Sequence, residues 1–326
     1  MGILHSGIVN SLPGAQVKAI CEKEDFLVKV ARTLLPKTVA VYKDHIEMVQ
    51  NEEIDAVFVT TPIASHVPLI LGLIRENSAI SLFVEKPLAA SGEEARKICD
   101  GVRDLRGAYM VGFQKRFSPI LGRAREIIKE DTLGELVSFR ASSFSSDVLR
   151  EGRSWRFSKG TGGVLLDLAP HLLDALLWFF GEPVSVESIK TRVYSSQVDD
   201  YVHAVMSYKS DMKGYMDTCW SMRGYRLPEL MIEVYGRNGT LTVTDEYLRT
   251  MLNRDTEGKT RGETLLYKQS FDTSVPFLLA DSEYTKEDQE FLACVENKTG
   301  PEVSFPEAAK VNELIDRINC ASQVRG

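Results

Sequence analysis

Residues 160–181, GTGGVLLDLAPHLLDALLWFFG, form an almost wholly apolar segment that holds three polar side chains, Asp167, His171 and Asp174. On a helix these positions are i, i+4 and i+7, so the three side chains share one face. An imidazole one turn from a carboxylate can accept a proton, because the carboxylate fixes its tautomer and stabilises the imidazolium. A polar stripe turned to solvent has the same spacing, so the spacing alone leaves both interpretations open.

Proline sets the local geometry of two candidate groups. Pro170 would remove a hydrogen bond from a continuous helix, so we expect a kink or a helix start there that directs His171 into a cleft. Lys86 follows the β-rich run 79–85, and Pro87 directly after it fixes the exit of the chain. A lysine at a strand end can also be an ordinary surface charge. The proline after it, which restricts the backbone, favours a functional role for Lys86 over that alternative.

Composition bounds the possible partners. The 326 residues, 44% hydrophobic and 26% charged, suffice for a sizeable core and two domains. With 39 Lys and Arg against 46 Asp and Glu and no basic block, we expect no nucleic-acid partner. The five cysteines lie far apart without CxxC spacing, which indicates neither a disulfide framework nor a zinc site and suits a reducing cytoplasm. The apolar runs are too short or too interrupted for a membrane span, and no signal region is recognisable.

Two patterns divide the chain. Short β-rich runs alternate with helical stretches from residue 16 to about 113, which predicts a doubly wound parallel α/β sheet of the Rossmann type. After residue 118 a helix (119–130) and the segment 160–181 accompany strands near 134–144, 202–209, 213–222, 230–236 and 239–245, and a last helix covers 306–322. This predicts a dinucleotide-binding domain over 1–118 and an α+β domain with a largely antiparallel open sheet over 119–326.

The amino terminus departs from the usual order. A doubly wound dinucleotide domain opens with a strand and a GxGxxG turn, whose backbone approaches a pyrophosphate. Here the chain begins at what matches the last glycine, Gly2, so the central first strand is lacking and we expect the natural gene product to be longer. Glu22, 20 residues past Gly2, ends the strand 16–21, where an acidic side chain binds ribose hydroxyls; it can equally be a solvated loop residue.

Three segments together carry a resemblance to a known family. FVEKPLA holds Glu85, Lys86 and Pro87, and VGFQKRFSP holds Arg116. The third segment, SWRFSKGTGGVLLDLAPHLLD, supplies Trp155, Arg156, Gly162, Gly163, Asp167, His171 and Asp174. In this order and spacing the chain resembles the Gfo/Idh/MocA family, named for glucose-fructose oxidoreductase and inositol dehydrogenase, over nearly its whole length.

The resemblance implies an NAD(P)-dependent dehydrogenase that transfers a hydride between a nicotinamide and a carbinol carbon of a sugar, nucleotide sugar or cyclitol. It implies that His171 is the proton acceptor, that Asp167 stabilises the resulting imidazolium, and that Lys86 binds the reacting oxygen. The residues it implies for the cofactor are Gly2, Glu22, Lys23, Thr61, Pro62, His66, Glu85, Lys86 and Arg116. Those it implies for the substrate are Lys86, Arg116, Trp155, Arg156 and His171, with Tyr225 or Arg226 as further candidates; ordinary packing is the alternative role for these side chains.

Two departures from the family pattern affect the expected cofactor contacts. Ala169 stands where glycine is usual, which narrows the space beside the nicotinamide, and Ile63 replaces an asparagine that often follows the strand-end Thr-Pro. We expect NAD, because the Glu22 carboxylate would repel a 2′-phosphate; Lys23 beside it keeps NADP as the alternative.

Two other functional classes stay open. NAD-dependent glycosidases oxidise a sugar carbon transiently, and some proteins of this fold bind dinucleotide or sugar without turnover. A binder would have no need for Lys86, Asp167 and His171 together. We also expect a homodimer or homotetramer formed through the second sheet, with alternating apolar residues of 202–209 and 230–236 on the face that meets the partner.

Overall fold

The computed structural model describes residues 1–256, 258–271 and 274–324, and these cluster into two compact units. Unit 1 comprises Met1–Ala89, Glu93–Gly112 and Val275–Ala309, and unit 2 comprises Ala90–Gly92, Phe113–Ser274 and Lys310–Gly326. Apart from residues 90–92, the amino-terminal part of the first unit extends to Gly112, whereas the predicted boundary lies at 118. The first unit also takes in a segment, 275–309, that the sequence analysis assigned to the second domain.

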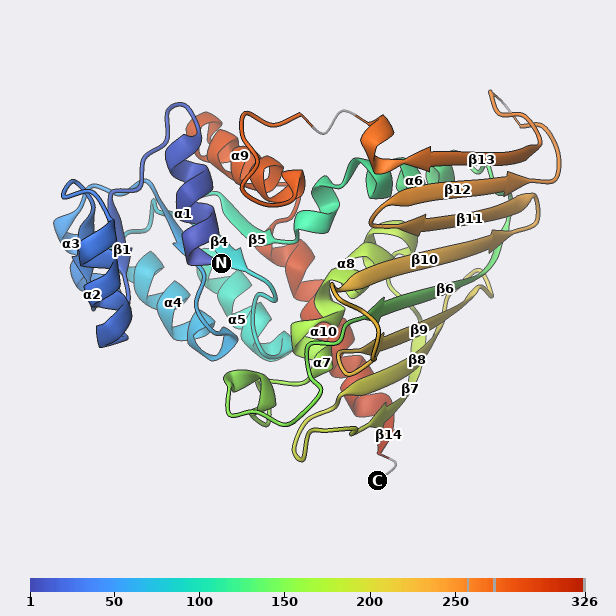
Figure 1. Ribbon diagram of the computed structural model, residues 1–326, viewed down its shortest axis with the longest axis horizontal. Coiled ribbons are helices and arrows are strands. Elements are labelled where there is room, and N and C mark those ends of the chain that lie inside the picture. Colours follow the sequence, from blue (N-terminus) through green and yellow to red (C-terminus); the bar gives the residue numbers. More distant parts are fainter. Residues whose placement is uncertain (257, 272–273, 325–326) are drawn as a thin grey trace. The chain divides into compact units, whose positions relative to one another are not determined.

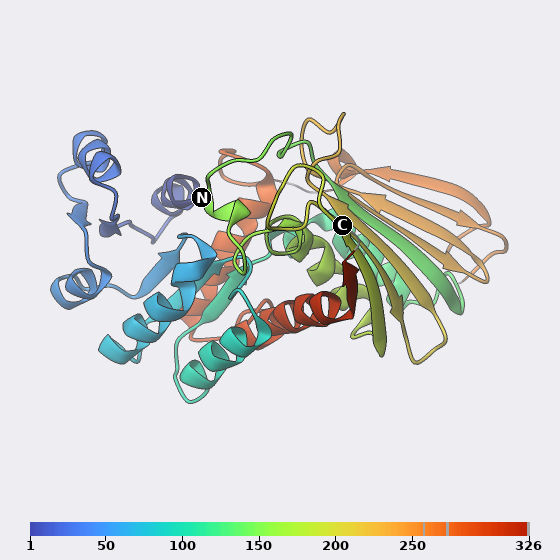
Figure 2. The same ribbon diagram turned by 90° about the horizontal axis from the view of Figure 1, so that it is seen from below.

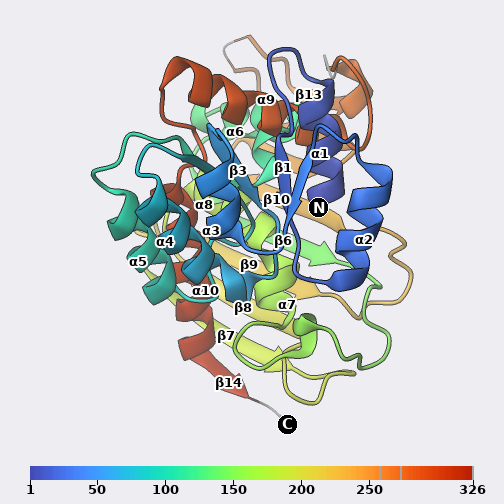
Figure 3. The ribbon, with the colours of Figure 1, turned by 90° about the vertical axis from the view of Figure 1, so that its left-hand side faces the viewer.

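Unit 1 alternates helices and short strands along the chain (Figures 1 and 3). Its elements are α1 (Gly2–Ser11), β1 (Ala19–Cys21), α2 (Asp25–Leu34), β2 (Ala40–Tyr42), α3 (His45–Asn51), β3 (Ala56–Val59), η1 (Ile63–Ser65), α4 (His66–Glu76), β4 (Ser81–Glu85), α5 (Gly92–Val102), β5 (Tyr109–Gly112) and α9 (Ser282–Asn297). α10 (Phe305–Ala321) begins in this unit. The sequence analysis did not identify α9.

All strand pairs of unit 1 are parallel, as predicted. β1 pairs with β2, and β4 lies between β3 and β5, so the strands form two separate sheets. In the described residues no strand bridges β1 and β3, which is the position of the first strand in a doubly wound order. β4 is buried along its whole length, with Leu82, Phe83 and Val84 fully inaccessible, as expected of a central parallel strand covered on both faces.

Unit 2 is built on one nine-stranded sheet, ordered β13-β12-β11-β10-β6-β9-β8-β7-β14 (Figure 1). The strands are β6 (Leu136–Phe144), β7 (Ser185–Thr191), β8 (Tyr201–Ser207), β9 (Lys213–Cys219), β10 (Glu229–Gly236), β11 (Gly239–Thr244), β12 (Tyr247–Leu252), β13 (Gly262–Tyr267) and β14 (Ser322–Val324). The helices are η2 (Gln114–Phe117), α6 (Pro119–Lys129), η3 (Trp155–Phe157), α7 (Val164–Asp167), α8 (Ala169–Phe180) and η4 (Lys268–Ser270). Among the described strands of this sheet only the pairs β6–β9 and β7–β14 are parallel, which confirms the predicted largely antiparallel sheet.

One face of this sheet is covered by helices of the same unit. α6 packs on β11 and β12, α7 on β8 and β9, and α8 on β6. Figure 2 shows these strands side by side, seen from below. The alternating apolar residues of β8 and β10, such as Val202, Met206, Ile232 and Val234, are fully buried under this layer. The prediction that they meet a partner subunit is therefore wrong, because the chain's own helices cover them.

The helices are short relative to a lipid bilayer. The longest, α9 and α10, have 16 and 17 residues, whereas a hydrocarbon core needs about 20 apolar residues. Among the described residues, no helix combines the length and the apolar character that a membrane span requires.

Candidate active site

In unit 1, the predicted cofactor residues gather at the carboxyl edge of the sheet β3-β4-β5. β3 ends at Val59 and leads to Thr61 and Pro62, while β4 ends at Glu85 and leads to Lys86. The two strands are parallel and paired, so their following residues emerge at the same edge. The structure therefore brings together the strand-end residues that the sequence predicted for the cofactor.

His66, at the start of α4, ties these two strand ends together. Its Nε2 lies 2.9 Å from the carbonyl oxygen of Thr61, and its Nδ1 lies 3.2 Å from the carbonyl oxygens of Pro87 and Leu88. The residue is 1% exposed, and burial lowers the pKa of its imidazole against the opposing effect of these backbone contacts. The ring thus links the backbone segments that follow the two strand ends, and its predicted contact with the cofactor stays a prediction.

The residues expected near the pyrophosphate and the adenosine ribose of the dinucleotide lie at the start of α1 and directly after β1. α1 starts at Gly2, where an added Cβ would lie 2.9 Å from Thr60 Oγ1, so a larger residue would require the Thr60 side chain to shift. Glu22 directly follows β1, and one of its carboxylate oxygens accepts the backbone N–H of Glu24 at 3.0 Å. Lys23 is exposed beside it.

In unit 2, the predicted break at Pro170 is confirmed. α7 ends at Asp167 and α8 starts at Ala169, with Pro170 in its first turn. Two positions before α7 require glycine. A Cβ on Gly162 would lie 2.1 Å from the carbonyl oxygen of Arg156, and Gly163 has a φ of +97°, which disfavours a side chain. The loop of η3 therefore packs directly on the backbone that enters α7.

Asp167 meets a cationic partner from this loop. Arg156 Nε donates to Asp167 Oδ2 at 2.7 Å, its Nη2 forms an ion pair with the same oxygen, and Nη2 lies 3.4 Å from Asp147. The guanidinium also lies over the Trp220 ring, 5.1 Å from its centroid. Arg156, predicted for the substrate, thus holds the carboxylate that was predicted to assist the base.

His171 is half-buried on α8 and packs edge-to-face against Phe113, with the ring centroids 6.1 Å apart. It belongs to unit 2, whereas Lys86 belongs to unit 1. That these two side chains act on one substrate oxygen therefore stays a prediction. The predicted stabilisation of the His171 imidazolium by Asp167 also stays a prediction.

Asp174, the third polar residue of the segment, is bound by Arg116. Arg116 Nε and Nη2 donate to the two carboxylate oxygens at 2.7 and 2.8 Å, a bidentate pair. The side chains are 6% and 2% exposed, and the guanidinium lies over Trp178, 5.0 Å from the ring centroid. This geometry explains Asp174 as the buried counter-charge of Arg116 and gives Arg116, predicted for cofactor and substrate, a structural part.

The remaining substrate candidates lie on loops of unit 2. Trp155 opens η3 and is 37% exposed, which suits a contact residue. Tyr225 lies between β9 and β10, where its N–H donates to Ser146 Oγ and its ring packs on Phe144. Arg226 follows it and is exposed.

Asp199 is a site-supporting residue that the sequence analysis missed. Its carbonyl oxygen accepts the N–H of Val164 at 2.9 Å, and its carboxylate accepts that of Leu165 at 3.3 Å, so it anchors the first turn of α7. Because 34 residues separate Asp199 from Leu165, no local capping pattern signals this contact.

Comparisons with known proteins converge on one family. Residues 4–113 match the description "Oxidoreductase family, NAD-binding Rossmann fold", and residues 121–242 match "GFO/IDH/MocA C-terminal domain". The chain is 22% identical to a D-apiose dehydrogenase from Paraburkholderia graminis, over 96% of this chain and 82% of that protein. It is 26% identical to scyllo-inositol 2-dehydrogenase (NAD(+)) from Bacillus subtilis, over 93% of this chain and 86% of that protein.

Solved structures share the fold. A levoglucosan dehydrogenase in complex with NADH and L-sorbose superposes with a TM-score of 0.85 at 22% identity, covering 98% of this chain and 93% of that one. An NAD-binding oxidoreductase from Klebsiella pneumoniae gives a TM-score of 0.84 at 21% identity, covering 98% and 94%.

Proposed function

The chain belongs to the GFO/IDH/MocA oxidoreductase family, and from this premise we propose that it is an NAD-dependent dehydrogenase acting on a carbinol carbon of a sugar, nucleotide sugar or cyclitol. The observation that carries the proposal is the pair of family matches, which join an NAD-binding Rossmann domain to the family's C-terminal domain in one chain. The relatives named for D-apiose and scyllo-inositol support a polyol or sugar substrate.

The residues at the carboxyl edge of β3 and β4 fit a dinucleotide. Gly2 begins α1 next to Thr60, and Thr61, Pro62 and Lys86 emerge at one sheet edge. These residues would hold the cofactor, and Glu22 after β1 would bind its adenosine ribose. When bound, NAD supplies the hydride acceptor.

The protein's own groups would handle the proton and the charge. A nitrogen of the His171 imidazole takes the hydroxyl proton, and the ammonium of Lys86 donates a hydrogen bond to the oxygen on which negative charge develops. Asp167, which Arg156 holds in place, stabilises the imidazolium. Trp155, exposed on the neighbouring loop of unit 2, is a candidate for substrate contact.

Reduction of NAD during a screen of polyols, sugars and nucleotide sugars tests the function. We expect at least one cyclitol or sugar to give net NADH, measured by absorbance, because a dehydrogenase releases the reduced cofactor. Cleavage of a glycoside without net NADH would favour the glycosidase alternative. Cofactor or sugar binding without either reaction would favour a non-catalytic binding protein.

We further propose a cytoplasmic protein whose partners are small molecules and copies of itself. All five cysteines are free, which suits a reducing compartment. The net charge of −7 disfavours a nucleic-acid partner.

The outer face of the unit 2 sheet is the proposed subunit interface. Cross-strand pairing places Tyr215, Met251 and Leu265 on the face opposite the helices, and they are 40%, 42% and 43% exposed. We expect light scattering at micromolar concentration to give the mass of a dimer or tetramer. Tyr215→Glu should shift the mass toward the monomer, whereas Phe26→Glu, on exposed α2, should not. A monomeric wild-type mass would rule this interface out.

A further inference from the structure

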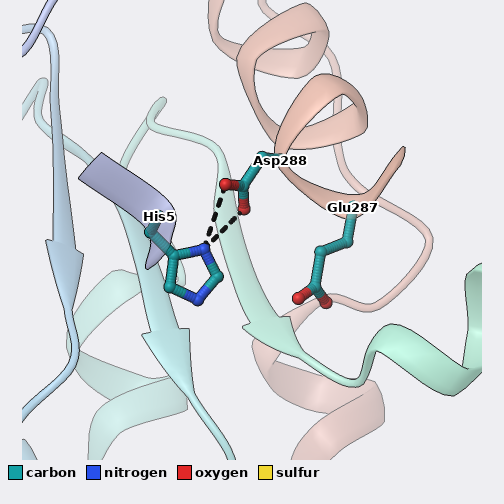
Figure 4. A group of neighbouring side chains, drawn as sticks. All are labelled: His5, Glu287 and Asp288. Atoms are coloured by element: carbon teal, nitrogen blue, oxygen red, sulfur yellow. Dashed lines mark hydrogen bonds and ion pairs between the residues drawn. The ribbon is translucent and has the colours of Figure 1, made fainter. Parts of the chain in front are cut away.

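Four ionisable side chains lie buried together inside unit 1. His5 comes from α1, Glu85 from the end of β4, and Glu287 and Asp288 from α9. They are 1%, 9%, 1% and 0% exposed. Figure 4 shows the Asp288 carboxylate against the His5 ring, with the Glu287 carboxylate beside them. Buried charges are costly unless they are paired, so their pairing indicates what the cluster does.

Both ring nitrogens of His5 face carboxylate oxygens. Nδ1 lies 2.8 and 3.0 Å from the two oxygens of Asp288, and Nε2 lies 3.0 Å from Glu85 Oε1. A carboxylate can only accept a hydrogen bond, so each nitrogen must donate one. The ring that satisfies both contacts is the doubly protonated imidazolium. Burial alone would lower the pKa of His5, but the hydrogen bonds and charges of Asp288 and Glu85 outweigh it and raise the pKa to about 9.

A bound metal ion is the alternative for this cluster. Ligand atoms of His5, Glu287 and Asp288 lie close enough to one another to surround a cation. A metal, however, requires the free lone pair of an imidazole nitrogen, whereas both ring nitrogens lie at hydrogen-bonding distances of 2.8–3.0 Å from carboxylate oxygens. The observed distances therefore favour the imidazolium over a metal ligand.

The cluster continues to the backbone of Lys86. The second oxygen of Glu85, Oε2, accepts the Lys86 N–H at 3.2 Å, so one carboxylate bridges the His5 ring and the residue after the strand. The ring also packs against Phe83 of the same strand, with centroids 5.0 Å apart. An unbroken series of contacts thus runs from α9 through His5 to the strand end.

We propose that His5 is a positioning residue: a buried imidazolium, anchored by Asp288, that orients the Glu85 carboxylate and through it the backbone of Lys86. The part of this inference that concerns turnover rests on the proposed function, because it assumes that Lys86 binds the reacting oxygen. The protonation state and the coupling to the Lys86 backbone do not depend on it.

The surrounding groups determine how the cluster responds to pH. Glu85 from β4 and Glu287, Asp288 and Tyr284 from α9 face His5. Burial, together with the charges of Glu85 and Asp288, raises the pKa of Glu287 well above its usual value and favours its neutral form. Burial also raises the pKa of Asp288, but the hydrogen bond and the charge of His5 oppose this and favour its carboxylate form. Burial raises the pKa of the Tyr284 phenol as well. The cluster then holds one cation between two carboxylates, with neutral groups around them.

The sign of the pH effect follows from the raised pKa of His5. Its stabilising contribution is fully present below the unfolded value of 6.5 and is lost as the pH rises through about 9. Ring-nitrogen NMR of histidine-labelled protein, without substrate, tests this directly. We expect both His5 nitrogens to carry protons at neutral pH and the Lys86 backbone amide shift to titrate together with them on the alkaline side.

The matched variants are His5→Gln and His203→Gln, since His203 also pairs with an aspartate, Asp217, but on the sheet of unit 2. His5→Gln should abolish the titration of the Lys86 amide and lower kcat about 10- to 100-fold, because small displacements of a catalytic group are costly. His203→Gln should change neither. Each of three results would overturn the proposal: a neutral His5 ring at neutral pH, displacement of the His5 protons by added Zn²⁺, or a Lys86 amide shift that does not change when His5 titrates. If no substrate reduces NAD, the proposed function fails while the NMR result still decides the state of His5.

Discussion

His171→Ala is expected to reduce turnover of the true substrate by roughly 10² to 10⁴ while leaving NAD binding nearly unchanged, because a positioned base contributes about this much. Lys86→Ala should also reduce turnover. The two groups are proposed to act on the same oxygen, so the losses in the double variant should not add, and it should be little worse than the poorer single variant. Turnover, NAD affinity and melting temperature measured on the same proteins give the comparison.

Asp167→Asn belongs to the same series and should also lower turnover, since an amide cannot stabilise an imidazolium. It removes the nearer of the two carboxylates that pair with Arg156 and leaves Asp147 at 3.4 Å, so its melting temperature must be compared with that of His171→Ala. His203→Ala, an imidazole on the sheet of unit 2, serves as the control and should retain activity. A well-folded His171→Ala protein with near-normal turnover would contradict the assignment of the base.

Asp174→Asn is expected to lower the free energy of unfolding by about 3–5 kcal/mol, the usual consequence of leaving one member of a buried ion pair without its partner. The Arg116 guanidinium would stay 6% exposed with its counter-charge gone. Denaturant unfolding measures the loss. Arg116→Met should be similarly damaging, whereas the double variant Arg116→Met/Asp174→Leu should recover most of the stability, because paired apolar replacements remove both buried charges.

An exposed pair of the same chemistry provides the control. Arg123 and Glu126 pair on the surface of α6, with side chains 30% and 61% exposed, so Glu126→Gln should cost only about 0–1 kcal/mol. If the Arg116 variant instead keeps its stability and loses affinity for cofactor or substrate, the guanidinium serves ligand binding, as the sequence had suggested.

Local patterns were enough to predict most elements of the fold. The alternation of short apolar runs with helical stretches predicted the parallel strands β1 to β5, and alternating residues predicted β8 to β11. Pro170 predicted the start of α8, because a proline in a helix interior lacks the N–H that the helix needs. These features depend on residues near one another in the chain, so the sequence determines them by itself.

The order of motifs also predicted the family. Glu85, Lys86 and Pro87 after one strand, followed by Asp167 and His171 in a glycine-preceded helix, carried the resemblance that the comparisons confirm. The sequence missed α9, whose polar and charged residues, among them Glu287 and Asp288, are buried in the structure.

Tertiary structure alone decided the partners of the charged residues. Asp288 meets His5 across 283 positions, Asp174 meets Arg116 across 58, and in both cases no spacing rule connects the two. Only the tertiary structure shows that helices of unit 2 cover the apolar face of its sheet. The sequence analysis had predicted that a partner subunit covers this face. These cases share a physical reason. A buried charge pairs with the group that the packed fold places within hydrogen-bonding distance, and an apolar face is covered by the surface that packs on it. Neither outcome depends on the local sequence.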